Sequence, residues 1–345
     1  MTTAGPLLGR APLDRRGLTP PSAIGPDPIL AAFARALSEA EAFAGATAPN
    51  PAVGCVILDA TGRELAVAAH EKAGQDHAEA AALSKVRAAG LADRIHTVVV
   101  TLEPCNHHGR TPPCVEAILA SGAQEVWIGA LDPNPRVAGG GARRLAAAGL
   151  RVRRIETLGR PGEELAAQAA RLIAPFAVWS LRRRPFLTVK RAFDRVGGMV
   201  PPQGLKTFTS EASLELAHRL RRRADGLITG SGTILADRPE FTVRRVADHP
   251  GKRRMLGILD RRGRTPSSYL EAARARGFDP MVAGDIDALL AAFADRGVLE
   301  ALIEAGPTVS EAFLARGLWD EQVLIRQGAG TGEPDRVEII ARGAN

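Results

Sequence analysis

Residues 77–83 read H-A-E-A-A-A-L, and residues 101–114 read T-L-E-P-C-N-H-H-G-R-T-P-P-C. Together they contain one imidazole, two thiols and a carboxylate that follows the imidazole by two positions. Zn²⁺ prefers nitrogen and sulfur ligands in a tetrahedron, and a catalytic site uses three protein ligands and leaves the fourth position for water. His77, Cys105 and Cys114 can supply those three ligands. The sequence therefore predicts a hydrolytic zinc site.

Glu79 is the predicted proton carrier of this site. Water bound to zinc yields hydroxide near neutral pH, and a carboxylate must then carry protons to the leaving amine. In a helix that starts near His77, both side chains lie within the first turn. The zinc deaminase signature is H-x-E followed by P-C-x-x-C. Here eight residues separate Cys105 from Cys114, which indicates a loop inserted between the two ligands. The alternatives are a structural zinc site, or no site and simple packing.

Composition bounds the class of protein. A length of 345 residues predicts two domains, and a hydrophobic content of 45% allows each a core. Only three cysteines are present; two are assigned to the metal and Cys55 lies in an apolar run, so a disulfide scaffold is excluded and a reducing compartment is expected. No apolar run approaches a membrane span, and the N-terminus lacks the apolar segment of a signal peptide. We expect a cytoplasmic protein without membrane contact.

The net positive charge of the chain favours a negatively charged ligand or partner. The formal net charge is +7 with a pI of about 10.0, which suits either nucleic acid or phosphorylated small molecules. Aromatic residues make up only 4% of the chain, which argues against stacking platforms for single strands. We therefore favour a small phosphorylated ligand and no nucleic acid.

Strands and helices alternate along the first half of the chain. Residues 1–28 are rich in Pro, Gly and Arg and are expected to be a disordered extension. Apolar residues at helical spacing predict a helix over 29–44, and a buried strand follows A-P-N-P at 48–51. The pattern continues with strands at 65–70, 97–102, 125–130 and 151–155 and helices at 77–89, 113–120 and 141–148. It predicts an α/β fold with a mostly parallel sheet.

A second α/β pattern begins after a helix at 163–174 and the R-R-R-P run at 182–185. Strands are expected at 186–192, 226–229, 255–259, 299–304, 322–326 and 336–340, and helices at 210–223, 286–296 and 309–316. The expected domains are 29–157, a linker helix over 158–184, and 185–345.

Several longer motifs carry a resemblance to a known family. They are P-N-P-A-V-G at 49–54, H-A-E at 77–79, T-L-E-P-C at 101–105, H-H-G-R-T-P-P-C at 107–114 and D-P-N-P at 132–135. Through these motifs, the first half of the chain resembles the bifunctional riboflavin-biosynthesis deaminase-reductases. The wide spacing between the two cysteines is part of that family's own pattern. The resemblance implies a cytidine-deaminase-like three-layer α/β/α domain followed by a dihydrofolate-reductase-like α/β domain, and a homo-oligomer.

The resemblance also implies a reaction and residue roles. The deaminase half would use zinc hydroxide to remove the 2-amino group of 2,5-diamino-6-ribosylamino-4(3H)-pyrimidinone 5′-phosphate, and the reductase half would then convert the ribosyl group to ribityl with NADPH. By position, His77, Cys105 and Cys114 hold Zn²⁺ and Glu79 shuttles protons. The residues implied to contact this substrate are Asn50, His107, Arg110, Asp132 and Asn134. Asn50 and Asp132 could instead be turn formers.

The second half resembles the family's reductase domain through G-S-G-T-I-L-A-D-R-P at 230–239 and E-A-G-P-T at 304–308. The implied NADPH contacts are Ala192, Thr207, Thr233, Asp237, Gly306, Pro307 and Thr308, the last three in a turn whose backbone N–H groups suit a phosphate. The implied substrate contacts are Arg221, Phe241, Arg244 and Glu304. Guanidinium groups match phosphate oxygens, although these arginines could also form a solvated helix face.

Some family positions are altered in the second half. Asp194, Arg195, Val196 and Gly197 replace the family's S-x-D-G, residues 205–207 replace S-x-W, and the tail is short. One alternative is therefore a deaminase whose reductase domain is degenerate. A further alternative is a nucleic-acid-acting deaminase such as a tRNA adenosine deaminase, which the wide cysteine spacing disfavours.

Overall fold

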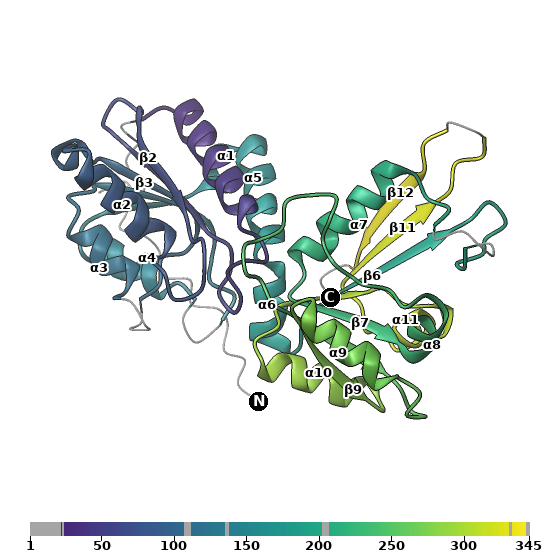
Figure 1. Cartoon of the computed structure of the whole chain (residues 1–345). Coiled ribbons are helices and arrows are strands. Elements are labelled where there is room, and N and C mark those ends of the chain that lie inside the picture. The colour runs from purple at the N-terminus through teal and green to yellow at the C-terminus, as the bar shows by residue number, and fades with distance from the viewer. Residues whose placement is uncertain are drawn as a thin grey trace, which may run out of the picture. The chain divides into compact units, whose positions relative to one another are not determined.

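The computed structural model describes residues 22, 24–106, 112–134, 138–201, 207–330 and 333–342. The chain forms two compact units that divide between Ala174 and Pro175. The predicted linker segment 158–184 falls on both sides of this division. Its helix α5 (Arg160–Leu172) packs on the first unit, and α6 (Ala174–Arg182) follows it. Figure 1 shows α5 beside α1.

The first unit contains a five-stranded sheet in the order β2-β1-β3-β4-β5. Its strands are β1 (Gly54–Leu58), β2 (Glu64–Ala69), β3 (Thr97–Leu102), β4 (Glu125–Ala130) and β5 (Arg151–Arg154). β1 pairs antiparallel with both β2 and β3, whereas β3, β4 and β5 pair in parallel. The prediction of a mostly parallel sheet is therefore wrong for half of the pairings. A short turn at 59–63 joins β1 to β2, and such a hairpin can only be antiparallel.

Helices cover both faces of this sheet. The elements are α1 (Pro26–Ala42), α2 (Ala78–Ala88), α3 (Cys114–Leu119) and α4 (Gly140–Ala147), with short 3₁₀ turns at Ala92–Arg94 and Ile155–Leu158. One apolar core lies between the sheet and α1 with α5, and another between the sheet and α2, α3 and α4. Gly54 permits the close packing of α1, because a Cβ there would lie 1.9 Å from the carbonyl oxygen of Ala36. The result is the expected three-layer α/β/α arrangement.

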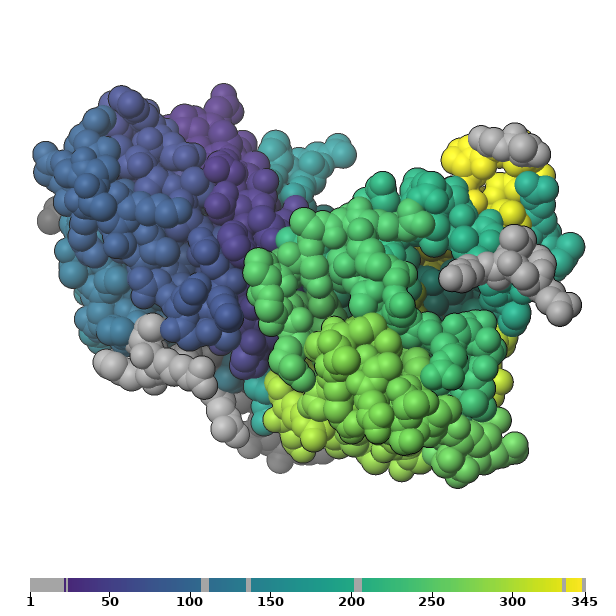
Figure 2. All heavy atoms as spheres, viewed as in Figure 1, coloured from purple at the N-terminus to yellow at the C-terminus, as the bar shows by residue number. Residues whose placement is uncertain are grey.

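The second unit contains a seven-stranded sheet in the order β12-β11-β6-β10-β7-β8-β9. Its strands are β6 (Phe186–Phe193), β7 (Gly226–Gly230), β8 (Arg254–Leu259), β9 (Phe278–Ala283), β10 (Glu300–Ile303), β11 (Glu321–Arg326) and β12 (Arg336–Ala341). All neighbours pair in parallel except β11 and β12. Figure 2 shows the last strands, in yellow, at the surface of this unit.

The helices of the second unit are α7 (Glu211–Arg223), α8 (Ser231–Asp237), α9 (Ser267–Ala275), α10 (Ile286–Asp295) and α11 (Pro307–Ala315). α8, α9 and β9 were not predicted from the sequence. β9 contains Pro280, which breaks a strand pattern but is tolerated here because β9 lies at the edge of the sheet. Within the described residues, no helix is long and apolar enough to cross a membrane.

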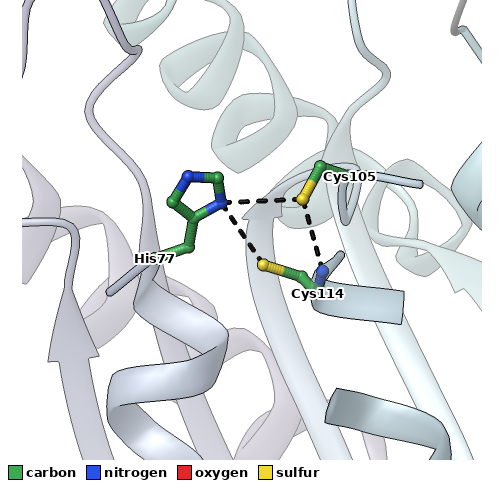
Figure 3. A group of neighbouring side chains, drawn as sticks. All are labelled: His77, Cys105 and Cys114. Atoms are coloured by element: carbon green, nitrogen blue, oxygen red, sulfur yellow. Dashed lines mark hydrogen bonds between the residues drawn. The ribbon is translucent and has the colours of Figure 1, made fainter. Parts of the chain in front are cut away.

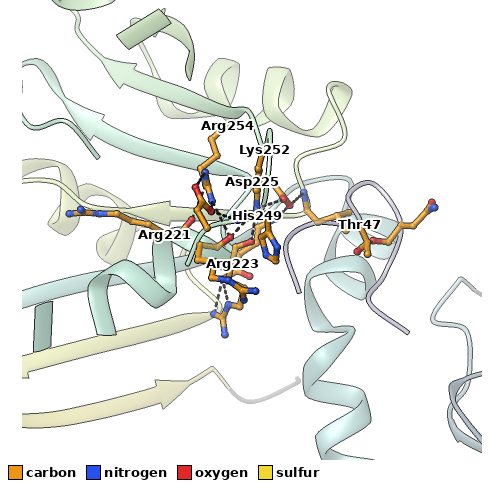
Figure 4. A network of polar contacts seen from close by, with 12 residues as sticks. Thr47, Arg221, Arg223, Asp225, His249, Lys252 and Arg254 are labelled. Atoms are coloured by element: carbon orange, nitrogen blue, oxygen red, sulfur yellow. Dashed lines mark hydrogen bonds and ion pairs between the residues drawn. The ribbon is translucent and has the colours of Figure 1, made fainter. Parts of the chain in front are cut away.

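Two cations from the start of β8 close the C-terminal end of α7. Lys252 Nζ lies 3.2 Å from the carbonyl oxygens of Arg222 and Arg223, and Arg254 Nε donates to that of Arg221 at 2.9 Å. Asp225 and Asp248 pair with these cations in turn, in the network of Figure 4. Cations at this end of a helix satisfy its last carbonyl groups and its dipole. The end of α7 that carries Arg221 is therefore held firmly.

Candidate active sites

The three predicted metal ligands meet at one point of the first unit. His77 immediately precedes α2, Cys105 follows β3, and Cys114 begins α3. His77 Nδ1 lies 3.6 Å from Cys105 Sγ and 3.4 Å from Cys114 Sγ, as Figure 3 shows. The three ligand atoms lie within 4.8 Å of one another.

This geometry fits a tetrahedral zinc ion. Zn–S bonds of about 2.3 Å and Zn–N bonds of about 2.0–2.1 Å, joined at the tetrahedral angle, place nitrogen and sulfur about 3.5 Å apart. The two nitrogen–sulfur distances of 3.6 and 3.4 Å agree with this value. Three protein ligands leave one position for water or substrate, as in catalytic sites.

Polar groups around Cys105 Sγ favour its thiolate, whereas the Cys105 side chain and burial raise the pKa of Cys114. The side chains of Cys114 and His77 and the backbone N–H of Cys114 hydrogen-bond to Cys105 Sγ and lower the pKa of Cys105 to about 4. The thiolate is the form that binds metal. Glu79 lies in the first turn of α2, is only 3% exposed, and has a pKa that burial raises. A buried carboxylate thus lies beside the candidate ligand set.

The predicted substrate contacts of the first unit are only partly described. Asn50 lies in the turn before β1, and its Nδ2 is 3.0 Å from Nε2 of His70. His107 and Arg110 fall outside the described residues. Asp132 and Asn134 follow β4, and Asp132 Oδ1 accepts a hydrogen bond from the backbone N–H of Asn134 at 2.8 Å. This contact is the turn-forming interaction expected of an aspartate.

The loop after β4 is held by Glu103, which the sequence analysis did not select. The buried carboxylate of Glu103 accepts hydrogen bonds from the backbone N–H groups of Asp132, Gly139 and Ala142, at 3.2, 2.8 and 3.0 Å. It therefore ties the segment after β4 and the start of α4 to the segment that carries Cys105. In the sequence, Glu103 could have been noticed as a charged residue at the end of an apolar strand, within the motif T-L-E-P-C.

Replacing Glu103 by Ala is expected to lower the free energy of unfolding by about 1–3 kcal/mol, because buried backbone N–H groups lose their acceptor. Urea unfolding followed by circular dichroism measures this change. Glu116→Ala is the matched control, since Glu116 is 46% exposed and its ion pair is with Arg144, and a surface pair contributes less than about 1 kcal/mol. Equal losses in the two variants would contradict the anchoring role of Glu103.

In the second unit, a carboxylate at the end of β10 binds two cations. Arg221 donates to Glu304 at 2.5 Å from Nε and 3.2 Å from Nη2, and Lys190 Nζ lies 3.1 Å from the same carboxylate. Burial alone would raise the pKa of Glu304, but Arg221 and Lys190 together lower it to about 2. The Arg221 guanidinium also lies over the Phe241 ring, 5.8 Å from its centroid. The sequence analysis missed Lys190, whose only signal was its place in the strand F-L-T-V-K.

Arg244, the other predicted substrate contact of the second unit, is connected electrostatically to the cluster of Arg221, Lys190 and Glu304 through His218. The backbone N–H of Arg244 donates to His218 Nδ1 at 2.8 Å, while the Arg244 side chain pairs with Glu240. Burial, followed by the charges of Arg221 and Arg244, lowers the pKa of His218. The charges of Arg221 and Arg244 thus both act on His218.

The predicted cofactor turn lies at the C-terminal ends of adjacent parallel strands. β7 runs into Gly230 and α8, and β10 runs through Gly306 into α11, which begins with Pro307 and Thr308. Thr233 Oγ1 accepts the Gly306 N–H at 3.1 Å and joins the two turns. A Cβ at Gly306 would contact only Thr233, so the backbone can be approached closely. This edge of a parallel sheet is where dinucleotides bind.

The other three predicted cofactor residues are less tightly grouped. Ala192 lies near the end of β6, and Asp237 ends α8 with an exposed side chain. Thr207 is exposed, and its hydroxyl contacts only Thr209 among the described residues. Within the part of the chain that the structure describes, neither Thr207 nor Asp237 hydrogen-bonds to the turn at Gly306.

Two family descriptions match the chain. Residues 29–130 match the cytidine and deoxycytidylate deaminase zinc-binding region, and residues 197–340 match the RibD C-terminal domain. Riboflavin biosynthesis protein RibD of Mycobacterium tuberculosis is 38% identical over 283 residues, which cover 79% of this chain and 77% of that protein. The chain belongs to the RibD family. Its relative RibD of Aquifex aeolicus is 33% identical over 84% of each chain.

Solved RibD structures share the fold. Acinetobacter baumannii RibD is 30% identical with a TM-score of 0.74, covering 90% of this chain and 89% of that one. A Thermotoga maritima protein described as a diaminohydroxyphosphoribosylaminopyrimidine deaminase/5-amino-6-(5-phosphoribosylamino)uracil reductase is 27% identical with a TM-score of 0.75, at the same coverage. This RibD-family chain is thus a bifunctional enzyme, with a zinc-dependent, cytidine-deaminase-like unit and an NADPH-dependent reductase unit.

Proposed function

We propose that this chain carries out two consecutive steps of riboflavin biosynthesis. It deaminates 2,5-diamino-6-ribosylamino-4(3H)-pyrimidinone 5′-phosphate to 5-amino-6-ribosylamino-2,4(1H,3H)-pyrimidinedione 5′-phosphate, and then reduces the ribosyl group to ribityl. The observation that carries the first step is the convergence of His77, Cys105 and Cys114 beside the buried Glu79. We assign deamination to residues 29–157 and reduction to residues 185–345.

In the first step, His77, Cys105 and Cys114 hold zinc, and Glu79 moves protons. Zinc, when bound, makes its water acidic enough to be a nucleophile near neutral pH. Glu79 accepts a proton as oxygen adds to the ring carbon, and it delivers a proton to the amino group, which leaves as ammonia. The geometry suits this role because Glu79 lies in the first turn of α2 and His77 is the N-cap residue of the same helix.

The substrate of this step is held by polar groups on the surrounding loops. Asn50 contacts the pyrimidine, and Asp132 and Asn134 contact the ribose phosphate together with His107 and Arg110. Support comes from the position of Asn50, whose partner His70 packs edge-on against His77 with ring centroids 5.1 Å apart.

In the second step, Arg221, Phe241, Arg244 and Glu304 bind the deaminated intermediate. Two arginines whose charges both act on His218 suit a phosphate, because guanidinium groups present several N–H donors to its oxygens. NADPH, when bound, supplies the hydride. The turn at Gly306, Pro307 and Thr308, with Ala192, Thr207, Thr233 and Asp237, holds this cofactor at the sheet edge.

A deaminase with a degenerate reductase unit is the second candidate. The altered segment 194–197 favours it: Asp194 Oδ1 accepts hydrogen bonds from the backbone N–H groups of Val196 and Gly198, so this carboxylate is occupied within its own loop. The cluster of Lys190, Arg221 and Glu304 argues against a degenerate reductase unit, because both cations still form ion pairs with the Glu304 carboxylate.

One coupled assay separates the two candidates. The purified chain is given the diaminopyrimidine phosphate with zinc, and ammonia release and NADPH absorbance are followed together. The two-step proposal requires ammonia release followed by one NADPH consumed per deaminated molecule. Ammonia release without NADPH consumption, also when the deaminated intermediate is supplied directly, would favour the degenerate reductase. Absence of ammonia release from the zinc-loaded chain would contradict both.

We place the active enzyme in the cytoplasm as a homo-oligomer, a dimer or tetramer, that does not act on nucleic acid. All three cysteines are free, which suits a reducing compartment. Val337 and Ile339 are 42% and 58% exposed on β12, the edge strand of the second sheet. Exposed apolar side chains on an unpaired edge suit a subunit contact.

A further inference from the structure

His70 is a buried histidine beside the metal ligands, and the proposed deamination assigns it no role. It follows β2 and is only 2% exposed. Its backbone N–H donates to the carbonyl oxygen of Val53 at 2.9 Å, which fixes its main chain next to β1. Its ring lies edge-on to the His77 ring. The ring is therefore placed between a metal ligand and the turn that carries Asn50.

The hydrogen bonds of His70 fix its tautomer. Nδ1 lies 3.0 Å from the carbonyl oxygen of Asp76, and a carbonyl oxygen can only accept, so Nδ1 carries the hydrogen. Nε2 lies 3.0 Å from the amide nitrogen of Asn50, which can only donate, so Nε2 accepts and the ring is neutral. A neutral ring with hydrogen on Nδ1 has a lone pair on Nε2. Nε2 is therefore an acceptor, pointed at Asn50.

The tautomer of His70 in turn orients the amide of Asn50. The two contacts of the ring are mutually consistent, because Nδ1 donates to Asp76 and Nε2 accepts from the Asn50 amide nitrogen at 3.0 Å. The amide oxygen is then the opposite arm, and it has no donor among the described residues. A hydrogen-bonded turn holds the backbone, since the Asn50 N–H donates to Thr47 O at 2.9 Å and Thr47 Oγ1 donates to Asn50 O at 2.9 Å.

We propose that His70 is a positioning residue for deamination, which sets the orientation of the Asn50 amide so that its oxygen faces the substrate. The Asn50 amide oxygen then accepts a hydrogen bond from an N–H donor of the substrate, such as a ring N–H or an amino group of the pyrimidine. A ring that presents only acceptors to this oxygen is disfavoured. The same imidazole supports the carbonyl of Asp76, the residue before His77. This inference rests on the proposed function, because it assumes that Asn50 contacts the pyrimidine.

A double-mutant cycle tests the coupling directly. His70→Asn keeps an amide N–H near the position of Nδ1, so the bond to Asp76 can persist, but it removes the Nε2 acceptor. His70→Asn is expected to raise the KM for the diaminopyrimidine phosphate about 5-fold to 10-fold, the range of one hydrogen bond, with kcat changed less than about twofold. Asn50→Ala should raise KM by at least as much. The double variant should be no worse than Asn50→Ala alone, because coupled residues are not additive.

Two further variants complete the experiment. His70→Gln places an amide near the Nε2 position and should recover most of the KM, and His96→Asn is the matched control, since His96 is buried in the same unit and bonds Thr97 instead. Zinc content is measured throughout and should stay at one ion per chain.

The outcomes that overturn this inference differ from those that overturn the proposed function. Additive effects of His70→Asn and Asn50→Ala would mean that His70 acts independently of Asn50, for example by touching substrate itself. Loss of zinc in His70→Asn would mean that it supports the ligand His77 instead. An unchanged KM in Asn50→Ala would remove both the pyrimidine contact and the role of His70. Only failure of the unsubstituted, zinc-loaded chain to release ammonia would contradict the proposed function itself.

Discussion

Glu79→Gln is expected to bind zinc as the unsubstituted chain does and to lose deamination by about 10²–10⁴-fold, the usual contribution of a positioned proton carrier. The three ligand atoms belong to His77, Cys105 and Cys114, so an amide at residue 79 leaves the metal in place. An amide cannot shuttle a proton at neutral pH. The measurement is ammonia release at saturating substrate, with zinc determined on the same sample.

A buried carboxylate also affects stability, so the effect on rate needs a control. Glu79 is 3% exposed and burial raises its pKa, and Gln fills nearly the same volume without a charge. We therefore expect an unfolding midpoint in urea close to that of the unsubstituted chain. Retention of more than a tenth of the deamination rate would show that another group carries the proton. Loss of zinc together with activity would instead identify Glu79 as a metal ligand.

Glu304→Gln is expected to reduce NADPH-dependent turnover of the deaminated intermediate by about 10²-fold or more, with deamination changed less than about twofold. The substitution leaves Lys190 and Arg221 without the carboxylate that holds them 3.1 and 2.5 Å away. Misplacing binding groups by about 1 Å can cost 10²-fold in rate. Deamination should survive because the two units have separate cores. Both activities are measured on one preparation.

The control for this variant is Glu311→Gln, since Glu311 is 63% exposed and pairs with Arg191 in the same unit. Its NADPH-dependent rate should stay within about twofold of the unsubstituted value. Equal rates for Glu304→Gln and the unsubstituted chain would remove Glu304 from the reductase site.

The free energy of unfolding at acidic pH reports independently on the charge of Glu304. Its pKa is about 2 in the folded chain against 4.5 for the ordinary carboxyl, so the stabilisation from its charge is present above pH 4.5 and is lost as pH falls toward 2. The difference in unfolding free energy between the unsubstituted chain and Glu304→Gln should shrink over this range.

The metal ligands could be predicted from the sequence because chemistry restricts them to few residue types. The order of one histidine, a carboxylate two positions later and two cysteines identified His77, Cys105 and Cys114 before any contact was known, and the structure brings these three together. The sheets were predicted less well. Alternation of strands and helices does not reveal that β1 pairs antiparallel with β3, because that pairing depends on how the chain returns after the β1–β2 hairpin.

The supporting residues were missed for a physical reason. Glu103, His70 and Lys190 act through side-chain contacts to other segments of the chain. Glu103 contacts Asp132, Gly139 and Ala142, His70 contacts Asn50, and Lys190 contacts Glu304. Such contacts follow no short-range spacing, so neither hydrophobic period nor motif predicts them. The sequence indicated only that Glu103 and His70 come at the ends of apolar strands and that Lys190 lies within one.

The most direct test of this account is X-ray absorption spectroscopy at the zinc edge of the purified, unsubstituted chain. A site built from His77, Cys105 and Cys114 predicts one zinc per chain with two sulfur neighbours at about 2.3 Å and two lighter neighbours, nitrogen and oxygen, at about 2.0–2.1 Å. Cys114→Ala should lose this signal together with ammonia release. Zinc with no sulfur neighbours, or ammonia release by a chain freed of metal, would contradict the account.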